Sequence, residues 1–314
     1  MFDTILYNAR VFHRGKFLDN HGVAIDNGKI RQIGPSENIE ALEAESRIDL
    51  AGGLLAPGYI DLHIHGLLEY LIDNGRKDLE AISEALPRFG TTSFLPTILP
   101  HSPDGEADFL REIARADTPG AEYLGFFLEG PFIAKTGAIR PEALADKSPE
   151  RIGRIRSALA PYRVIFAVSP EVPGIVSILD HMERPAFITH TQADAAQTTA
   201  AISRGAIHAT HFYNVFFIPE ETDPGVRPSG AVEAILQDPE VSVDFILDGE
   251  HVDPIAVKLA LSCKPVDKVC LITDSNIGAG MEPGVYSGFG GDEVQFSYPG
   301  GPARGTAKSL HPGG

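Results

Sequence analysis

Apolar and polar positions follow two different patterns along the chain, and the change falls near residue 52. Before it, short segments alternate between apolar and polar residues, which is typical of half-buried strands. Two of these segments, GVAID and KIRQIG, flank Asn27-Gly28, a dipeptide that between two strand-like runs predicts a hairpin. We therefore expect a small β domain over residues 1–52, too short to bury a full core by itself.

After residue 52, apolar runs alternate with segments that repeat apolar residues every three to four positions. The runs are typical of buried strands and the intervening segments of helices. The strand candidates are residues 59–65, 92–99, 121–130, 163–171, 185–192, 207–214, 241–249 and 268–275. Eight strands that alternate with helices predict an α/β fold, a parallel (β/α)8 TIM-like barrel over residues 53–290. A doubly wound open sheet is the alternative, but it needs a glycine-rich phosphate loop after its first strand, and GLLEYLIDNG is not one.

The last part of the sequence, residues 291–314, is rich in glycine and proline and lacks helical periodicity. A barrel of this kind carries an eighth helix after its last strand, and the sequence has no pattern for one. We expect an irregular tail over residues 291–314, a chain that ends early for its own architecture, and a small β domain that is incomplete.

Composition and charge narrow the classes of function. The chain has 314 residues, of which 43% are hydrophobic and 22% charged, as in ordinary globular proteins. The formal net charge of −17 argues against a nucleic acid or a membrane as partner, although a local pocket can still bind an anionic substrate. The N-terminus does not resemble a secretory signal, and no stretch approaches the length of a membrane span. The two cysteines, Cys263 and Cys270, are expected to be reduced core residues, and the protein is expected to be cytoplasmic.

Residues that can bind a metal occur where the strand candidates end, which is where parallel barrels carry their chemistry. His63 and His65 are two apart and therefore share one face of the first strand. The later strand ends add Glu129, His190, His211, His251 and Asp274. A single buried histidine is more often structural, but this set predicts a site for one or two ions of Zn²⁺, Fe²⁺, Mn²⁺ or Co²⁺, because it has imidazoles and carboxylates and no thiolate. His208 lies three positions before His211, so we expect it to face the opposite way and pack against a helix.

Several ordered motifs carry a resemblance to a known family. PGYIDLHIH after a small β unit resembles the amidohydrolase superfamily. The motifs LEGPFI (128–133), THTQ (189–192), HFYN (211–214), DGEHV (248–252) and ITDS (272–275) resemble the N-acetylglucosamine-6-phosphate deacetylases. The resemblance extends from the N-terminus to about residue 290. It implies a metal-dependent hydrolase barrel that removes the acetyl group from N-acetylglucosamine-6-phosphate or a related N-acetyl amino sugar, and that forms a homodimer.

The same resemblance implies a role for each matching residue. The ligands of the main metal, with zinc as the first expectation, are matched by Glu129, His190 and His211. An optional second-metal pair is matched by His63 and His65. Asp274 matches the catalytic acid and base. Contacts to the sugar are matched by Ala138, Asn214, Val215 and His251.

The chemistry of amide hydrolysis supports these roles independently. A divalent metal lowers the pKa of a bound water, and a nearby carboxylate takes its proton and returns it to the departing amine. Asp274 is the carboxylate that remains once Glu129 is used as a ligand, although it could also be the cap of a turn. His251 could donate to the carbonyl oxygen as charge develops there.

Departures from the family pattern concern recognition of the phosphate. Ile139 follows Gly137-Ala138 where family members have a histidine, and Thr222 stands where they have the arginine that binds phosphate from the neighbouring subunit. Arg227 or Arg140 could substitute, but each is more typical of a surface residue. We therefore expect intact hydrolytic machinery and weaker phosphate recognition. The alternatives are an amidohydrolase of another N-acyl amine or cyclic amide, and a non-catalytic relative that acts as an assembly partner.

Overall fold

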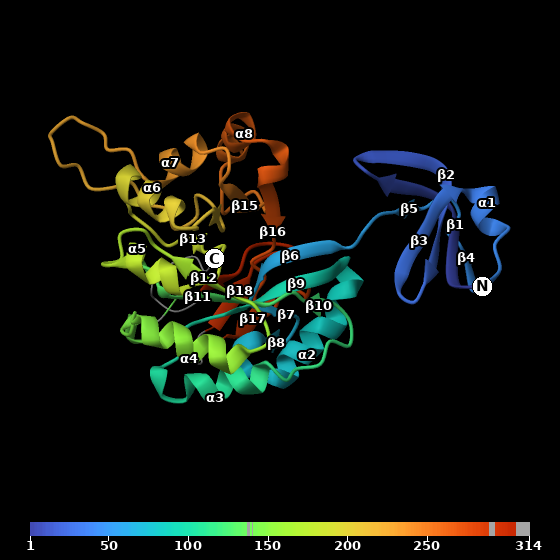
Figure 1. Cartoon of the computed structure of the whole chain (residues 1–314), viewed down its shortest axis with the longest axis horizontal. Helices are drawn as coiled ribbons and strands as arrows, with labels where there is room; N and C mark the ends of the chain where they lie inside the picture. The colour runs from blue at the N-terminus through green and yellow to red at the C-terminus, as the bar shows by residue number, and fades with distance from the viewer. Residues whose placement is uncertain (137–138, 140, 289–292, 306–314) are drawn as a thin grey trace. The chain divides into compact units, whose positions relative to one another are not determined.

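The computed structural model describes residues 1–136, 139, 141–288 and 293–305. Ala138 and Arg140 lie outside the described residues. The chain divides into two compact units, Met1–Tyr59 and Ile60–Gly314, which Figure 1 colours in chain order. Among the described residues, no helix combines the length and the apolar character needed to cross a membrane.

The first unit is a five-stranded sheet with one short helix, α1 (Ser36–Glu40). Its strands are β1 (Phe2–His13), β2 (Lys16–Asp26), β3 (Lys29–Pro35), β4 (Ala44–Asp49) and β5 (Leu54–Leu55). The first three form an antiparallel meander, and the last two pair in parallel with β1. Asn27 and Gly28 have φ values of 52° and 66°, the left-handed values of a two-residue hairpin turn. The predicted hairpin is confirmed.

The second unit is a nearly closed parallel barrel, so the predicted fold class is confirmed. Its eight strands are β6 (Tyr59–Ile64), β9 (Thr91–Ile98), β11 (Phe126–Phe132), β12 (Val164–Val168), β13 (Phe187–Ile188), β14 (His208–Ala209), β15 (Ser242–Ile246) and β16 (Val269–Ile272). They pair in this order around the barrel, and the short β10 (Glu122–Tyr123) also pairs with β9. The first and last strands form no continuous ladder within the described residues, but an isolated bridge between Ile64 and Ser275 joins their carboxyl ends.

A helix lies in each connection between successive barrel strands, and Figure 1 shows the helices around the strands. They are α2 (Arg76–Ala85), α3 (Pro103–Ile113), α4 (Pro149–Leu159), α5 (Ile175–Ile178), α6 (Ala195–Ser203), α7 (Ala231–Gln237) and α8 (Pro254–Cys263). Several begin at a residue whose side chain accepts a backbone N–H of the first turn, namely Ser148, Asp194 and Asp253. Such caps satisfy donors that have no partner within the helix.

Alternate residues of the barrel strands pack into two different cores. In β11, Phe126 and Leu128 pack in the core between strands and helices, whereas Phe127 packs inside the barrel. Ile165 of β12 and Phe187 of β13 contribute to the same inner core. Because both faces of these strands are buried, their sequences are nearly continuous runs of apolar residues.

Gly66 allows the first and last barrel strands to meet directly after the two histidines of β6. A Cβ atom at Gly66 would lie 2.6 Å from the carbonyl oxygen of Tyr70 and 2.8 Å from the nitrogen of Ile277. The backbone N–H groups of His65 and Gly66 both donate to the carbonyl oxygen of Ser275, at 2.9 and 3.0 Å. The close approach therefore needs glycine, and it joins the carboxyl ends of β6 and β16.

After β16, the described residues form short strands and no further helix. β17 (Gly284–Ser287), β18 (Glu293–Phe296) and β19 (Arg304–Gly305) make a three-stranded antiparallel sheet. Two of these strands fall within residues 291–314, where we expected an irregular tail. Phe296 is buried and contacts the ring of Tyr286 across the sheet.

Both cysteines are free, and only one of them is partly buried. Cys270 is half-buried in β16, whereas Cys263 is exposed at the end of α8. The expectation that both lie in the core is therefore wrong for Cys263. Apart from Lys258 and Ser262, α8 is made of apolar residues, and it buries Ala256 and Ala260, so the exposure of Cys263 could not be read from its sequence.

Candidate metal centre

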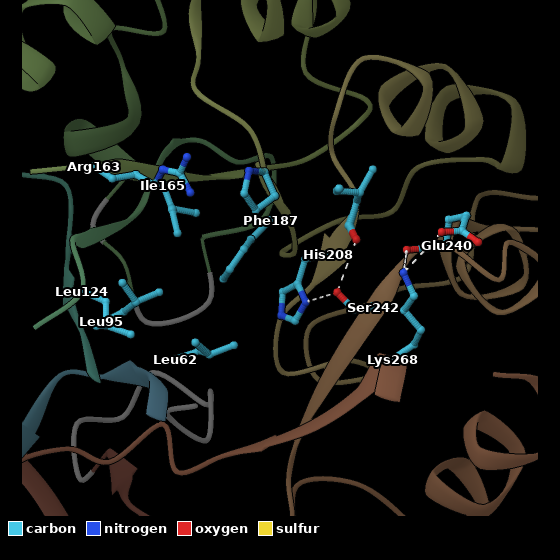
Figure 2. A pocket seen from close by; sticks show the side chains of 12 residues that line it. Leu62, Leu95, Leu124, Arg163, Ile165, Phe187, His208, Glu240, Ser242 and Lys268 are labelled. Carbon is cyan, nitrogen blue, oxygen red and sulfur yellow. Dashed lines mark hydrogen bonds and ion pairs between the residues drawn. The ribbon is translucent and has the colours of Figure 1, made fainter. Parts of the chain in front are cut away.

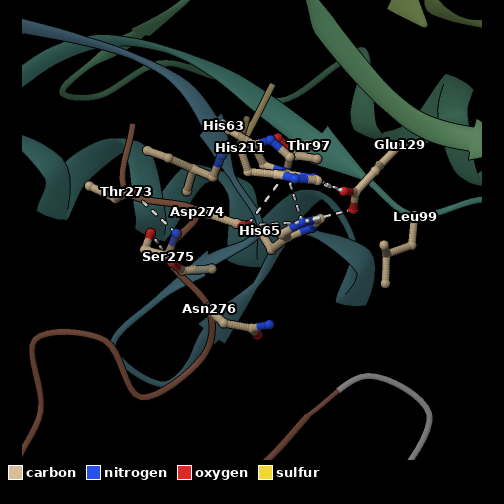
Figure 3. Close-up of polar contacts among 12 residues, drawn as sticks. His63, His65, Thr97, Leu99, Glu129, His211, Thr273, Asp274, Ser275 and Asn276 are labelled. Carbon is tan, nitrogen blue, oxygen red and sulfur yellow. Dashed lines mark hydrogen bonds and ion pairs between the residues drawn. The ribbon is translucent and has the colours of Figure 1, made fainter. Parts of the chain in front are cut away.

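Six polar side chains from five strands meet at the carboxyl end of the barrel, and each is at most 7% exposed. They are His63, His65, Glu129, His190, His211 and Asp274. Glu129 lies within β11, and the others lie in or within two residues of the ends of β6, β13, β14 and β16. Figure 3 shows several of these side chains pointing toward one another.

The Glu129 carboxylate lies at the centre of the imidazoles. Its Oε1 is 3.2 Å from His190 Nε2 and 3.1 Å from His211 Nε2. Its Oε2 is 3.2 Å from His65 Nε2. His63 Nε2 is 3.7 Å from Oε1, so one carboxylate contacts four imidazoles.

Asp274 lies on the other side of the His63 and His65 rings. Its Oδ1 is 3.4 Å from His63 Nε2 and 3.5 Å from His65 Nε2 (Figure 3). Both carboxylate oxygens of Asp274 and Nδ1 of His65 are buried, and none has a hydrogen-bond partner among the described residues. Buried polar atoms without partners are costly, which indicates that the site accepts a further group.

The donor atoms fit a divalent transition-metal ion. Two groups of three residues each hold their ligand atoms within 4.8 Å of one another, and both include His63. One adds Glu129 and His211, and the other adds His65 and Asp274. Imidazole nitrogens and carboxylate oxygens suit zinc, manganese, iron or cobalt.

Charges within the cluster shift pKa values in opposite directions. Burial would raise the pKa of Glu129, but hydrogen bonds from His190, His211 and His65 hold it well below its usual value. Burial lowers the pKa of His63 to about 4. Burial also acts to lower the pKa values of His65 and His211, but the hydrogen bond and the charge of Glu129 raise both to about 9. Protonated imidazoles thus balance Glu129, and a metal cation can supply the same positive charge.

The backbone turns sharply where several of these side chains enter the site. His190, His211 and Asp274 have φ values of 50°, 34° and 48°. Tyr213 and Val215, in the loop after β14, have values of 76° and 56°. Such left-handed conformations cost free energy in residues other than glycine and are concentrated at functional sites.

Hydrogen bonds at Nδ1 orient the rings of two candidate metal ligands, His190 and His63. Nδ1 of His190 lies 2.8 Å from the carbonyl oxygen of Lys135, which makes Nδ1 the donor and directs Nε2 toward Glu129. Nδ1 of His63 lies 3.1 Å from the hydroxyl oxygen of Thr210. Ring contacts of this kind fix the orientation of metal-binding histidines.

A buried carboxylate on β15 holds the backbone at His211. The Oδ1 atom of Asp244 accepts the His211 N–H at 2.5 Å, and the backbone oxygen of Asp244 accepts the N–H of Phe212 at 2.9 Å. Oδ2 of Asp244 lies 2.8 Å from Nε2 of His208, whose Nδ1 lies 2.7 Å from the Ser242 hydroxyl. The expectation that His208 packs against a helix is wrong, because its ring packs on Phe187 of the inner core and contacts Asp244. Side chains in a strand alternate between its two faces, but His211 departs from this pattern because its left-handed backbone turns the side chain inward.

A second buried carboxylate, Asp61, supports the ends of β6 and β16. It accepts the His63 N–H at 3.2 Å and the Thr273 hydroxyl at 2.7 Å. Burial raises the pKa of Asp61 to about 6, although the hydrogen bond from Thr273 acts in the opposite direction. We did not identify Asp61 or Asp244 from the sequence, although an acidic residue inside an apolar strand is itself a signal of a specific partner.

The predicted sugar contacts lie in two loops at the same end of the barrel. Asn214 and Val215 follow His211, and the backbone oxygen of Asn214 lies 3.2 Å from Nδ1 of His211. The side-chain oxygen Oδ1 of Asn214 is buried and has no hydrogen-bond partner among the described residues. His251 follows β15, where Oδ2 of Asp248 lies 2.6 Å from its Nδ1.

A cavity of about 390 Å³ occurs at the other end of the barrel (Figure 2). Its lining comes from the beginnings of the strands, including Leu62, Ile165, Phe187, His208 and Ser242. The six clustered side chains lie at the carboxyl ends, so this cavity is not the candidate metal centre. His208 is the link between the two, through Asp244 to the backbone of His211.

Comparisons with known proteins agree with this architecture. No family model matches the chain. The chain is 32% identical over 302 residues to the N-acetylglucosamine-6-phosphate deacetylase of Bacillus subtilis (strain 168), covering 92% of this chain and 74% of that protein. It is 29% identical over 301 residues to the N-acetylgalactosamine-6-phosphate deacetylase of Escherichia coli O157:H7, covering 93% of this chain and 76% of that protein.

Solved structures show the same relationship. The N-acetyl-D-glucosamine-6-phosphate deacetylase from Mycobacterium smegmatis matches with a TM-score of 0.83 at 26% identity, covering 99% of this chain and 80% of that chain. Enamidase, of the amidohydrolase superfamily, matches with a TM-score of 0.54 at 17% identity, covering 88% and 72%, and shares the fold alone. The resemblance found in the sequence motifs is confirmed, and so is the expectation of a hydrolase acting on carbon–nitrogen bonds. The chain belongs to the N-acetylglucosamine-6-phosphate deacetylase family of the amidohydrolase superfamily.

Proposed function

We propose that this enzyme removes the acetyl group from N-acetylglucosamine-6-phosphate or a closely related N-acetyl amino sugar phosphate. The observation that carries the proposal is the buried cluster of four imidazoles and two carboxylates at the carboxyl end of the barrel. Relatives named as deacetylases of N-acetylglucosamine-6-phosphate and N-acetylgalactosamine-6-phosphate support the class of substrate. The reaction breaks the amide C–N bond with water and releases acetate and the free amino sugar.

The main metal would be held by Glu129, His190 and His211, and a second ion by His63 and His65. Nε2 of His190 and Nε2 of His211 both lie next to Oε1 of Glu129, which supports the binding of one ion by all three side chains. When bound, a divalent cation activates a water molecule and polarises the acetyl carbonyl. Zinc is the first candidate, because nitrogen and oxygen donors without thiolate are common in catalytic zinc sites.

Asp274 would move the proton during hydrolysis. Its carboxylate oxygens are buried and have no hydrogen-bond partner among the described residues, so they are available to a water molecule on the side of His63 and His65. The carboxylate takes a proton as water attacks the acetyl carbon and returns it to the nitrogen as the C–N bond breaks. The amine then leaves in its neutral form.

The sugar would be held by Ala138, Asn214, Val215 and His251. Asn214 offers a buried side-chain oxygen that can accept a hydrogen bond from a sugar hydroxyl. His251 is oriented by Asp248, which places a polar ring in the loop that follows β15. The family resemblance supports Ala138 and Val215 as backbone contacts.

Acetate release tests the proposal. The purified protein, supplied in turn with zinc, manganese, iron or cobalt, is assayed with N-acetylglucosamine-6-phosphate, N-acetylgalactosamine-6-phosphate and the two unphosphorylated sugars. We expect hydrolysis of at least one phosphorylated sugar and its loss on chelation. The proposal fails if the metal-loaded protein hydrolyses none of these compounds but hydrolyses another N-acyl amine.

Three further properties are part of the same proposal. We expect a homodimer, a cytoplasmic location and a role in carbohydrate metabolism, each supported by the family relationship. Light scattering of the purified protein measures the first, and cell fractionation the second.

A further inference from the structure

We propose that the ammonium group of Lys135 binds the phosphate group of the substrate and thereby determines specificity for phosphorylated sugars. The inference rests on the proposed function, because it names the residue that recognises one part of that substrate. The sequence predicts Arg140 or Arg227 as the cation that could replace the missing arginine, and it does not predict this role for Lys135.

The backbone of Lys135 lies directly beside the candidate metal centre. Its N–H donates to the carbonyl oxygen of His190 at 2.9 Å, and its own carbonyl oxygen is 2.8 Å from Nδ1 of His190. These two hydrogen bonds tie Lys135 to a ring that contacts Glu129. The lysine side chain therefore starts next to the place where the acetyl group would react.

The side chain of Lys135 extends between two loops at the barrel end. Its Nζ donates to Oε1 of Gln192 at 2.6 Å, and Nε2 of Gln192 donates to the carbonyl oxygen of Ile218 at 2.9 Å. Nζ also lies 6.0 Å from the centroid of the Phe217 ring. The ammonium group thus lies beside the loop that follows β14, which also carries Asn214.

The two loops are connected to each other, which fixes the position of the ammonium group. The Thr191 N–H donates to the carbonyl oxygen of Val215 at 3.1 Å, and the Phe217 N–H donates to the carbonyl oxygen of Thr191 at 2.8 Å. Asn214 and Val215 are the proposed sugar contacts in this loop. A sugar held there would place a substituent within reach of Lys135.

The positive charge of Lys135 has no carboxylate partner within the described part of the chain. Glu171 contacts the residues beside it in this loop, and its two oxygens accept the Gln192 N–H and the Thr191 hydroxyl, both at 2.6 Å. The side-chain partner of Lys135 is the neutral amide of Gln192. Lys135 is partly buried, and an ammonium group whose partner among the described residues is a neutral amide is suited to an anion, because lysine binds phosphate as a compact point charge.

Two arginines near this end of the barrel already have acidic partners. Arg227 is 2.9 Å from Glu233, and its side chain is 72% exposed. Arg304 pairs with Glu250. Thr222, which stands where relatives have a phosphate-binding arginine, is exposed and carries no charge. Lys135 is therefore better placed than Arg227 or Arg304 to take over part of that role.

Substitution of Lys135 tests the proposal by the ratio of two substrates. Lys135→Met removes the charge and keeps most of the length, whereas Lys135→Arg keeps the charge. kcat/KM is measured for N-acetylglucosamine with and without its 6-phosphate. In Lys135→Met we expect kcat/KM for the phosphorylated sugar to fall by about tenfold to a hundredfold relative to the plain sugar, as the loss of a charge-assisted hydrogen bond implies. Lys135→Arg should recover much of the preference.

Arg227→Met is the matched control, because it removes a different cation at the same end of the chain's barrel. It should leave the substrate ratio of the wild type unchanged. The proposal is wrong if Arg227→Met abolishes the preference, or if Lys135→Met lowers kcat/KM equally for both sugars. It is also wrong if the wild type does not distinguish the two sugars.

A binding measurement separates this inference from the proposed function. Glucosamine-6-phosphate and glucosamine are titrated into the metal-loaded wild type and the Lys135→Met variant by calorimetry, which needs no turnover. We expect the wild type to bind the phosphorylated amine more tightly and Lys135→Met to lose that difference. If acetate release fails for every sugar while this difference persists, the proposed function is wrong and the phosphate site stands.

Discussion

The proposed proton transfer by Asp274 can be tested by replacing one oxygen of its carboxylate with an amide nitrogen. Both of its oxygens are buried beside His63 and His65 without a hydrogen-bond partner among the described residues. Asp274→Asn keeps the shape and removes the base. We expect kcat to fall by a factor on the order of 10² or more, the usual contribution of general acid–base catalysis. Steady-state assays of acetate release measure the change.

The bound metal should change little in this variant if Asp274 serves mainly as base. Elemental analysis of the purified protein checks that point. Asp267→Asn is the control, because Asp267 is exposed on the short turn before β16 and the substitution removes the same charge. Near-normal turnover in Asp274→Asn would assign the proton transfer to another group.

At the scale of elements, β15 holds the end of the neighbouring strand β14 through the side chain of Asp244. Asp244 accepts the N–H of His211 and contacts His208, so it holds the left-handed turn that brings the His211 ring into the site. Asp244→Asn should weaken zinc binding by roughly tenfold to a hundredfold, because groups that orient metal ligands typically have effects of that size. Competition with a chelator of known affinity measures it on the folded protein.

Ser242→Ala provides a graded comparison for Asp244→Asn. It removes only the hydroxyl that lies 2.7 Å from His208, one step further from the metal site. We expect a smaller loss of zinc affinity than in Asp244→Asn. If Asp244→Asn unfolds at a lower temperature yet binds zinc like the wild type, Asp244 contributes to stability alone.

At the scale of the whole molecule, metal binding should stabilise one compact unit and not the other. Every candidate ligand, from His63 to Asp274, belongs to the unit Ile60–Gly314. A ligand at a hundredfold excess over its Kd stabilises the fold that binds it by about 2.7 kcal/mol. Hydrogen exchange with and without zinc should show added protection in β6, β11 and β14 and little change in β1 and β2. Equal protection in both units would contradict this assignment.

Glu129→Gln is the control for the metal experiment, because it removes the carboxylate that contacts four imidazoles. Zinc should then leave the exchange of the barrel strands nearly unchanged. A full response in Glu129→Gln would mean that the ion binds elsewhere.

Local patterns in the sequence were sufficient to predict the N-terminal hairpin, the barrel strands and the region of the site, but not the strands β18 and β19. These patterns involve residues that are neighbours or lie two to four positions apart in the chain. They include the Asn27-Gly28 turn, the eight apolar runs and the two histidines of β6. Because parallel barrels place their strand ends together, polar residues at those ends could be predicted to meet. The fold class therefore followed from these patterns, whereas the family followed from the resemblance of the ordered motifs.

Contacts between strands could not be predicted in this way, because they depend on register and on how each strand ends. Asp244 reaches His211, and Lys135 reaches His190, across tens of residues in the chain. His211 has a left-handed backbone although it is not a glycine, so the sequence gives no sign of this conformation. The conformation places the ring on the face of the strand opposite to the one that alternation of side chains predicts. The sequence by itself determined which residues could form a metal centre, and only the tertiary structure decided how they are oriented and which buried charges hold them, since those depend on atoms brought together by folding.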